Sequence, residues 1–175
     1  MPAPLIWLGA ACLGLYASNK ANVAYLKHHD IVDAMPGESD QKSIPVNGSI
    51  VTCGIYGVLD HTGIWYENTI YELSGKGLVR CVSPERFLGN RSGTHIYVAC
   101  KPNNKVLANC LAANRARKQL FTLLDYHLFD QNCHRFVAEM LVNHEVAVTS
   151  FSDLNTFLSE FFDVPIKWNR ALVKK

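Results

Sequence analysis

The chain has 175 residues, of which 49% are hydrophobic and 18% are charged, and its formal net charge is +2. This length and composition predict a globular protein with one core and exclude a disordered chain. The net charge is too small to indicate nucleic acid binding, and the lysines and arginines are scattered along the sequence. We therefore expect no nucleic acid partner.

Residues 1–20 are predicted to form a hydrophobic helix. No charged side chain precedes Lys20, and residues 5–17 are strongly apolar. A helix of about 18 residues is roughly 27 Å long, which is just enough for the hydrocarbon core of a bilayer. Lys20 and Lys27 follow the segment, so the positive-inside tendency places the rest of the chain in the cytoplasm. A membrane anchor is the preferred interpretation, and a helix packed on the domain or lying in the membrane interface is the alternative.

Residues 21–45 are predicted to be a linker, because the stretch from Pro36 to Ser43 is polar and rich in turn residues. Residues 46–175 are then expected to form the folded domain. It opens with short β-type runs that Gly, Asn and Pro residues separate, as in an antiparallel meander of about five strands. The runs cover residues 49–56, 61–66, 69–73, 78–82 and 95–101.

Helical patterns dominate after the strands. Ser83 and Pro84 are typical of a capped helical turn, and longer helices are expected around residues 106–113, 136–141 and 152–161. Strands followed by helices, without βαβ alternation, predict an α+β fold with an antiparallel sheet packed on helices. The basic residues from Lys167 to Lys175 are expected in a solvated C-terminal end.

The six cysteines favour a reduced protein. Cys53, Cys81 and Cys100 lie in apolar strand-like runs, and Cys110 lies in a helical pattern. Such placement is typical of buried free thiols and indicates a reducing compartment. Neither Cys-x-x-Cys nor His-Glu-x-x-His spacing occurs, and no glycine-rich phosphate loop is present. We expect no metal and no cofactor.

Cys133 is the candidate nucleophile. Asp130 or Asn132 can cap the helix that follows, which places Cys133 in the first turn. The positive end of the helix dipole favours a thiolate there, and the N–H groups of the first turn can bind an oxyanion. Phe136 and Val137 share the core-facing stripe with Cys133, which therefore points toward the sheet. Taken alone, Cys133 is better explained as a buried core cysteine, because free cysteines are commonly buried.

His61 is the candidate base and Glu72 its partner. His61, Gly63 and Trp65 share one face of the predicted strand 61–66. If residues 67–68 are the turn of a symmetric hairpin, Gly63 pairs with Glu72, and Glu72 is a diagonal neighbour of His61 on the same face. Gly63 would leave room between the two side chains. A three-residue loop would shift the register and turn Glu72 to the other face.

Two motifs together carry a resemblance to a known family. The segments Asp60-His61-Thr62-Gly63-Ile64-Trp65 and Asn132-Cys133-His134-Arg135-Phe136-Val137 resemble the His-x-Gly-Ile-Tyr and Asn-Cys-Glu-His-Phe motifs of the lecithin:retinol acyltransferase-like family. The entry Gly48-Ser49-Ile50-Val51 resembles the family's Gly-Asp-Leu-Ile. That family belongs to the larger group of permuted papain-fold proteins that includes the NlpC/P60 enzymes. The likeness covers about residues 44–145.

The resemblance implies a circularly permuted papain-like domain that moves or removes acyl groups through a cysteine thioester. Cys133 would be the nucleophile, His61 the general base and Glu72 the residue that orients His61. Asn132 would support the oxyanion site. Animal members often have histidine at the position of Glu72, whereas some bacterial relatives have glutamate. The expected partners are a lipid or an acylated small molecule and a membrane.

Two other functions remain open at this stage. The same three residues suit a cysteine peptidase or amidase of NlpC/P60 type. A membrane-anchored module that keeps the fold for binding, without catalysis, is the other alternative.

Overall fold

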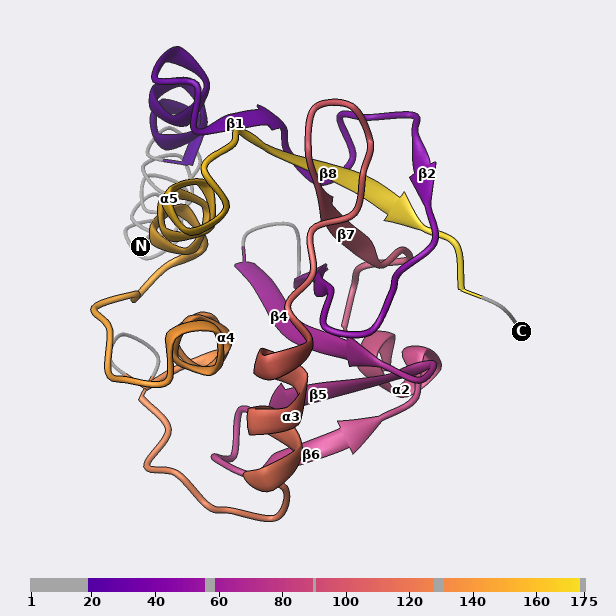
Figure 1. Cartoon of the computed structure of the whole chain (residues 1–175), viewed down its shortest axis with the longest axis vertical. Helices are drawn as coiled ribbons and strands as arrows, with labels where there is room; N and C mark the ends of the chain where they lie inside the picture. The colour runs from indigo at the N-terminus through magenta and orange to yellow at the C-terminus, as the bar shows by residue number, and fades with distance from the viewer. Residues whose placement is uncertain (1–18, 56–58, 90, 128–130, 174–175) are drawn as a thin grey trace, which may run out of the picture.

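The computed structural model describes residues 19–55, 59–89, 91–127 and 131–173. It has an α+β fold in which eight strands form one mixed sheet (Figure 1). The sheet order is β1-β8-β7-β3-β4-β5-β6, and β2 also pairs with β8. The strands are β1 Val32–Ala34, β2 Lys42–Ser43, β3 Ile50–Ile55, β4 Leu59–Tyr66, β5 Thr69–Leu73, β6 Val79–Val82, β7 Tyr97–Cys100 and β8 Ile166–Ala171.

Most strand pairs are antiparallel, and only β1 and β2 run parallel to their partner β8. The strands β3, β4, β5 and β6 pair in chain order, as expected for a meander, but β7 pairs with β3 and not with β6. Five helical segments accompany the sheet within the described residues: residues 19–28, α2 Pro84–Leu88, α3 Cys110–Lys118, α4 Cys133–Val142 and α5 Phe151–Phe162.

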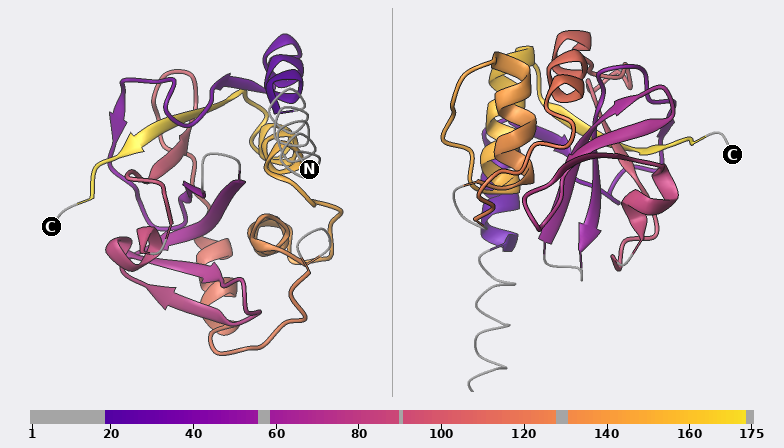
Figure 2. Two further views of the ribbon diagram at one scale, coloured as in Figure 1. Left: turned by 180° about the vertical axis from the view of Figure 1, so that it is seen from behind. Right: turned by 90° about the horizontal axis from the view of Figure 1, so that it is seen from below.

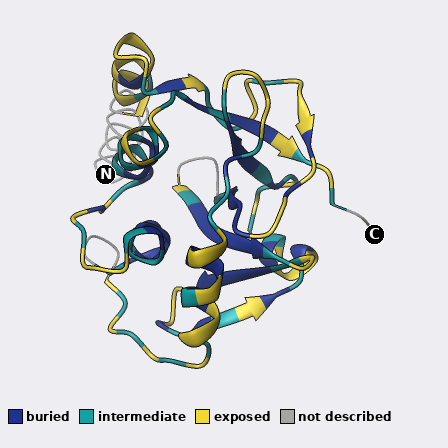
Figure 3. Ribbon diagram, in the orientation of Figure 1, coloured by how far each residue is buried: buried dark blue, intermediate teal, exposed yellow. Residues whose placement is uncertain are grey.

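The helices α3, α4 and α5 lie on one face of the sheet, and α4 packs on β4 and β5 (Figure 2). Their apolar stripes meet Ile64 and Leu73 in the larger core. A smaller core on the opposite face holds Trp65 and Phe87, the latter from α2. The two cores lie on opposite sides of β4, as the alternation of its side chains requires. Figure 3 shows that the central strands and the inner side of α4 are buried.

The sheet is larger than the five strands expected from the sequence. Two of the additional strands, β1 and β2, have three and two residues, which is too short for an alternating pattern to be recognised. They lie in residues 21–45, the expected linker, where Leu26 and Val32 are also part of the larger core. The third, β8, begins within the expected solvated C-terminal end, and its Trp168 is fully buried. The alternation of Ile166 and Trp168 was a signal for this strand.

Helix positions follow the local signals closely. Ser83 caps α2 and Pro84 is its first residue, as predicted. The helix expected at 106–113 starts only at Cys110, because residue 107 instead bonds to the edge of β7. The predicted hydrophobic helix at residues 1–20 lies, except for its last two residues, outside the described part of the chain. Among the described residues, no helix combines the length and apolar character needed to cross a membrane.

Candidate functional site

Cys133 is the first residue of α4, and Asn132 is the cap. The Asn132 side-chain oxygen accepts hydrogen bonds from the backbone N–H groups of His134 and Arg135, at 2.9 and 3.0 Å. Its amide nitrogen donates to the carbonyl of Thr149 at 2.7 Å. Asn132 therefore fixes both the start of α4 and its distance from the loop before α5. The alternative cap, Asp130, lies outside the described residues.

The β4–β5 hairpin has the register expected for a two-residue turn. Tyr66 pairs with Thr69, and Ile64 pairs with Tyr71. The turn residues Glu67 and Asn68 have φ values of 47° and 61°, the left-handed conformation that a two-residue hairpin loop requires. Continued along the strands, this register places Gly63 opposite Glu72. The hairpin therefore has the two-residue turn that places Glu72 on the same face as His61.

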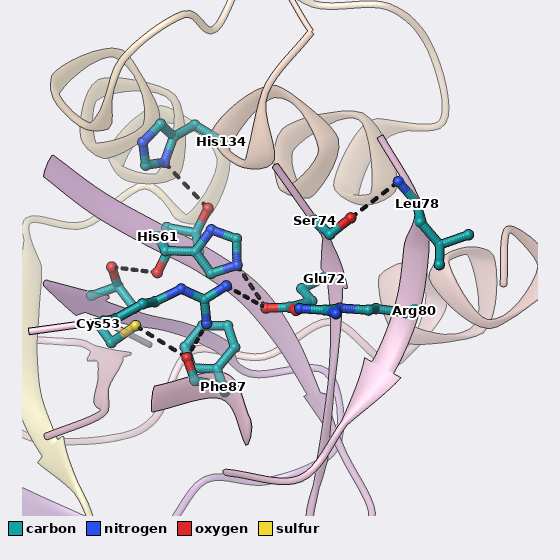
Figure 4. A network of polar contacts seen from close by, with 11 residues as sticks. Cys53, His61, Glu72, Ser74, Leu78, Arg80, Phe87 and His134 are labelled. Atoms are coloured by element: carbon teal, nitrogen blue, oxygen red, sulfur yellow. Dashed lines mark hydrogen bonds and ion pairs between the residues drawn. The ribbon is translucent and has the colours of Figure 1, made fainter. Parts of the chain in front are cut away.

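His61 and Glu72 are in direct contact. Their Nε2 and Oε2 atoms are 2.7 Å apart (Figure 4). Both side chains are buried, with 4% of His61 and none of Glu72 exposed. With Nε2 facing the carboxylate, Nδ1 is the ring nitrogen left for another partner. Papain-like chemistry needs this arrangement, in which one imidazole nitrogen is held and the other takes the proton of the nucleophile.

Cys133 interacts with the same imidazole through a side-chain hydrogen bond. Burial alone would raise the pKa of the Cys133 thiol, but the charge of His61 and the contacts with His61 and Thr62 outweigh burial and lower it. Burial likewise opposes the charged form of His61, yet the interactions with Cys133 and Glu72 raise its pKa. The two shifts have opposite signs and favour the same state, a thiolate beside an imidazolium.

The Glu72 carboxylate contacts two arginines in addition to His61. Arg80 Nε donates to Glu72 Oε1 at 2.7 Å, and Arg91 Nη2 donates to Oε2 at 3.2 Å. Burial alone would raise the pKa of Glu72, but His61, Arg91 and Arg80 together lower it. The carboxylate is therefore ionised although it is fully buried. Neither arginine was singled out from the sequence.

The two arginines differ in how readily the sequence could have indicated them. Arg80 is directly opposite Glu72 in the β5–β6 hairpin, so the register of two predicted strands was a usable signal. Arg91 follows α2 in an irregular segment, and no local pattern connects it with Glu72. Its position depends on the packing of that segment against the sheet.

The first turn of α4 offers fewer oxyanion donors than expected. The N–H groups of His134 and Arg135 are bonded to Asn132, and that of Phe136 donates to the Asn132 carbonyl. Among the described residues of this turn, the backbone N–H of Cys133 is the donor without such a bond. Asn132 supports the site as the cap of α4, with its side-chain oxygen bonded to the first turn and its amide nitrogen donating to Thr149.

Four more side chains lie near Cys133 and His61. His134 is buried, and burial followed by the charge of His61 lowers its pKa to about 3, so it is neutral. The ring Nδ1 of His134 meets the hydroxyl of Thr62 at 3.2 Å (Figure 4). Burial, and then the proximity of Cys133, raise the pKa of Tyr126. Cys53, opposite His61 in β3, is also buried, and burial raises the pKa of its thiol to about 12.

A cavity of about 760 Å³ borders the strand end that carries His61. Its wall combines apolar and polar side chains from separate segments, among them Val23, Pro36, Leu59, Asp60, His95 and Tyr97. Asp60 precedes His61, and burial raises the pKa of Asp60 to about 6. Asp60 also acts electrostatically on Cys53, as Cys133 does. Asp60, which lines this cavity, is next to His61 in the chain, whereas Cys133, His61 and Glu72 are not among the lining residues.

Five of the six cysteines lie in the described part of the chain. Cys53, Cys81, Cys100, Cys110 and Cys133 are free thiols. Cys81 and Cys110 are exposed, in contrast to the burial expected for both. Within the described ranges, no group of three or more His, Cys, Asp or Glu side chains is arranged to hold a metal ion.

Two comparisons with known proteins find no match. No protein-family model matches the sequence, and a search of curated proteins gives no significant match. The chemistry of the site is therefore argued from its geometry.

Proposed function

We propose that this protein is a cysteine-dependent acyltransferase or acyl hydrolase that acts on lipid-type acyl esters. The observation that carries the proposal is the convergence of Cys133, His61 and Glu72 from α4, β4 and β5. A buried thiol with a lowered pKa, beside an imidazole held by an ionised carboxylate, is the arrangement needed for covalent catalysis.

The first half of the reaction forms the acyl-enzyme. His61 takes the proton of Cys133, and the thiolate attacks the carbonyl carbon of the ester. The oxyanion of the tetrahedral intermediate is met by the backbone N–H of Cys133. The intermediate collapses when the carbon–oxygen bond to the alcohol breaks. His61 then returns its proton to the departing oxygen, and a thioester remains.

The second half releases the acyl group. An alcohol, an amine or water attacks the thioester while His61 accepts its proton. The carbon–sulfur bond breaks and Cys133 is regenerated, with the proton again shared with His61. Glu72 stays ionised throughout because Arg80 and Arg91 neutralise it. Its part is to orient the imidazole and to stabilise its charged form.

The choice of lipid-type esters rests on the motifs around His61 and Cys133, which resemble those of the lecithin:retinol acyltransferase-like family. We extend the proposal to a circularly permuted papain-like arrangement, in which the histidine strand precedes the cysteine helix. The cavity beside Asp60 offers room for a substrate. Membrane association, with the catalytic domain in the cytoplasm, is proposed from the apolar residues 5–17.

The proposal is tested by trapping the acyl-enzyme. The full-length protein is incubated with a p-nitrophenyl fatty acyl ester, and its mass is measured after rapid acid quenching. We expect one acyl group on Cys133, released by hydroxylamine, and none on the Cys133→Ala variant. Cys53→Ala is the matched control, because it removes a second buried thiol near the site. Equal labelling of wild type and Cys133→Ala would contradict the proposal.

A cysteine peptidase or amidase is the second candidate, and the polar part of the cavity wall favours it. Asp60, Ser92, Thr94 and His95 can contact the polar groups of a peptide. The same protein is therefore assayed with fatty acyl esters and with short peptide amides in parallel. Turnover of the peptide amides alone, lost in Cys133→Ala, would select this candidate. Turnover of neither substrate, without labelling of Cys133, would instead indicate a binding module.

A further inference from the structure

The two oxygens of Glu72 are used unequally. Among the described residues, Oε1 binds Arg80 alone, with contacts of 2.6 and 2.7 Å. Oε2 is shared between His61 Nε2 at 2.7 Å and Arg91 Nη2 at 3.2 Å. The guanidinium of Arg91 and the imidazole of His61 therefore meet at one oxygen atom, so the ionisation of His61 is directly sensitive to Arg91.

Arg91 is held firmly in this position. Its Nη1 donates a hydrogen bond to the carbonyl oxygen of Phe87. Its guanidinium carbon lies 5.2 Å from the centre of the Phe87 ring, which in turn lies 5.1 Å from the centre of the His61 ring. Only 13% of the Arg91 side chain is exposed, against 40% for Arg80. Solvent therefore screens the charge of Arg91 less than that of Arg80.

We propose that Arg91 is a positioning residue that sets the ionisation of the His61–Cys133 pair by sharing Glu72 Oε2 with His61. This inference rests on the proposed function. A cation at that oxygen opposes a second cation on the imidazole and favours an anion on the nearby sulfur. Arg91 thus lowers the pKa of both groups, which keeps Cys133 ionised at lower pH and helps the His61 imidazolium return its proton to a leaving group.

Other titratable or charged side chains face the same pair. They are Arg80, Cys53, Asp60, Tyr126 and His134. His134 is neutral, and the raised pKa values of Cys53 and Tyr126 keep both uncharged near neutral pH. Arg80 binds the oxygen that His61 does not use. Asp60, next to His61 in the chain, is ionised above about pH 6, and its charge acts on Cys53.

The test compares pH profiles of wild type and Arg91→Gln. Two readouts are used: the rate of acyl-enzyme formation, and the alkylation of Cys133 by iodoacetamide, followed by peptide mass spectrometry. We expect both limbs of the acylation profile, and the thiolate limb of alkylation, to move to higher pH by about 0.5–1 unit. At the acidic limb this corresponds to a roughly three- to tenfold lower rate.

Three further variants separate charge from structure. Arg91→Lys keeps the charge, and its profile is expected within about 0.2 unit of wild type, since one unit is a tenfold change. Arg80→Gln is expected to shift the profile less than Arg91→Gln, because Arg80 is more exposed and binds Oε1. Arg86→Gln, on the exposed side of α2, is the matched control and should leave the profile unchanged. A lower rate for Arg91→Gln at an unshifted pH profile would overturn the proposal.

A double-mutant comparison tests whether Arg91 acts through Glu72. In the Glu72→Gln background, adding Arg91→Gln should shift the alkylation profile by no more than half of its effect in wild type. A full-sized shift would overturn the shared-oxygen mechanism. If Arg91→Gln alone does not fold, the double variant, which leaves no unpaired charge at that position, is compared with Glu72→Gln, and a shift of about 0.5 unit or more between these two would overturn the mechanism. Alkylation needs no acyl substrate, so it distinguishes failure of this inference from failure of the proposed function.

Discussion

His61 and Glu72 touch at 2.7 Å although they are not directly opposite in the β4–β5 hairpin. Glu72 is opposite Gly63, so the carboxylate reaches diagonally past a position without a side chain. Diagonal neighbours in an antiparallel pair are about 7–8 Å apart at the backbone, a span that a glutamate and a histidine can close. The contact therefore depends on one hairpin register, and the consequences can be measured.

Glu72→Gln should impair both activity and folding. It leaves Arg80 and Arg91 without a buried counter-charge, which we expect to cost about 3 kcal/mol of unfolding free energy at pH 7. Because the folded-state pKa of Glu72 is lowered, its contribution is present above the ordinary value of 4.5 and disappears as pH falls through the folded-state value. Urea unfolding at pH 7 and pH 3 measures this difference. Acylation should slow about a hundredfold at pH 7.

The exposed Glu160→Gln variant on α5 is the control for this charge change. It should alter neither stability nor acylation measurably. A Glu72→Gln protein as stable as wild type at pH 7 would show that the arginines find other partners.

His61→Gln should raise the pKa of Cys133, because the imidazole is what overcomes the burial of the thiol. Alkylation of Cys133 at pH 7 should slow at least about tenfold, which corresponds to a rise of one unit in the pKa of the thiol. The stabilisation due to His61 itself is fully present below its ordinary pKa of 6.5 and is lost as pH rises through the raised folded-state value. The variant should thus be more destabilised at pH 6 than at pH 9. His144→Gln, at the exposed end of α4, is the control.

Asp60→Asn should stabilise the protein near neutral pH. Burial raises the pKa of Asp60 to about 6, so the folded state favours the protonated acid. The ionised form destabilises the fold progressively as pH rises from about 4 to about 6. We expect a gain of about 1–2 kcal/mol for the variant at pH 7.5, reduced from the full linkage value because the side chain is partly exposed. At pH 3.5 the two proteins should be equally stable, and a gain that persists there would contradict this explanation.

Gly63→Ala should destabilise the fold and disturb the site. A methyl group at Gly63 would lie 2.5 Å from Ile70 Cγ2, 2.8 Å from the backbone carbonyl oxygen of Tyr71 and 3.2 Å from the Phe87 ring. The space beside Gly63 is thus already filled by Ile70 and Phe87. We expect a loss of about 1–3 kcal/mol in thermal or urea unfolding. Gly54→Ala is the matched control, since nothing lies within 4 Å of its added methyl group, and a similar loss there would remove the steric explanation.

Asn132→Ala should cost about 1–2 kcal/mol, because α4 loses its cap and the Thr149 carbonyl loses its donor. It should also lower the rate of acylation by moving the first turn that carries Cys133. Asn109→Ala removes the cap of α3, away from the nucleophile. The two variants should be similarly destabilised, but only Asn132→Ala should slow acylation. Equal acylation rates for the two variants would show that the Asn132 cap does not affect the acylation step.

Several features of the site could be predicted because they are encoded over a few residues. The Asn132 amide can reach the N–H groups two and three positions ahead, so the start of α4 follows from local sequence. Asn68 favours positive φ but Glu67 does not, so the sequence left the two-residue turn as a condition, and the structure shows that both residues have positive φ. The same local logic identified α2 from Ser83 and Pro84.

Other features depend on segments that are far apart in the chain. The short strands β1 and β2 exist because β8, more than 120 residues later, supplies their hydrogen-bond partners. The convergence of Cys133 with His61, and of Arg91 with Glu72, follows from packing α4 and the segment after α2 on opposite faces of the sheet. By itself, therefore, the sequence determined the orientation of each reactive side chain on its own element, since short-range hydrogen bonds and backbone sterics act within a few residues. Only the tertiary structure decided the charges, because the ionisation of a buried thiol, imidazole or carboxylate depends on desolvation and on neighbours brought from elsewhere in the chain.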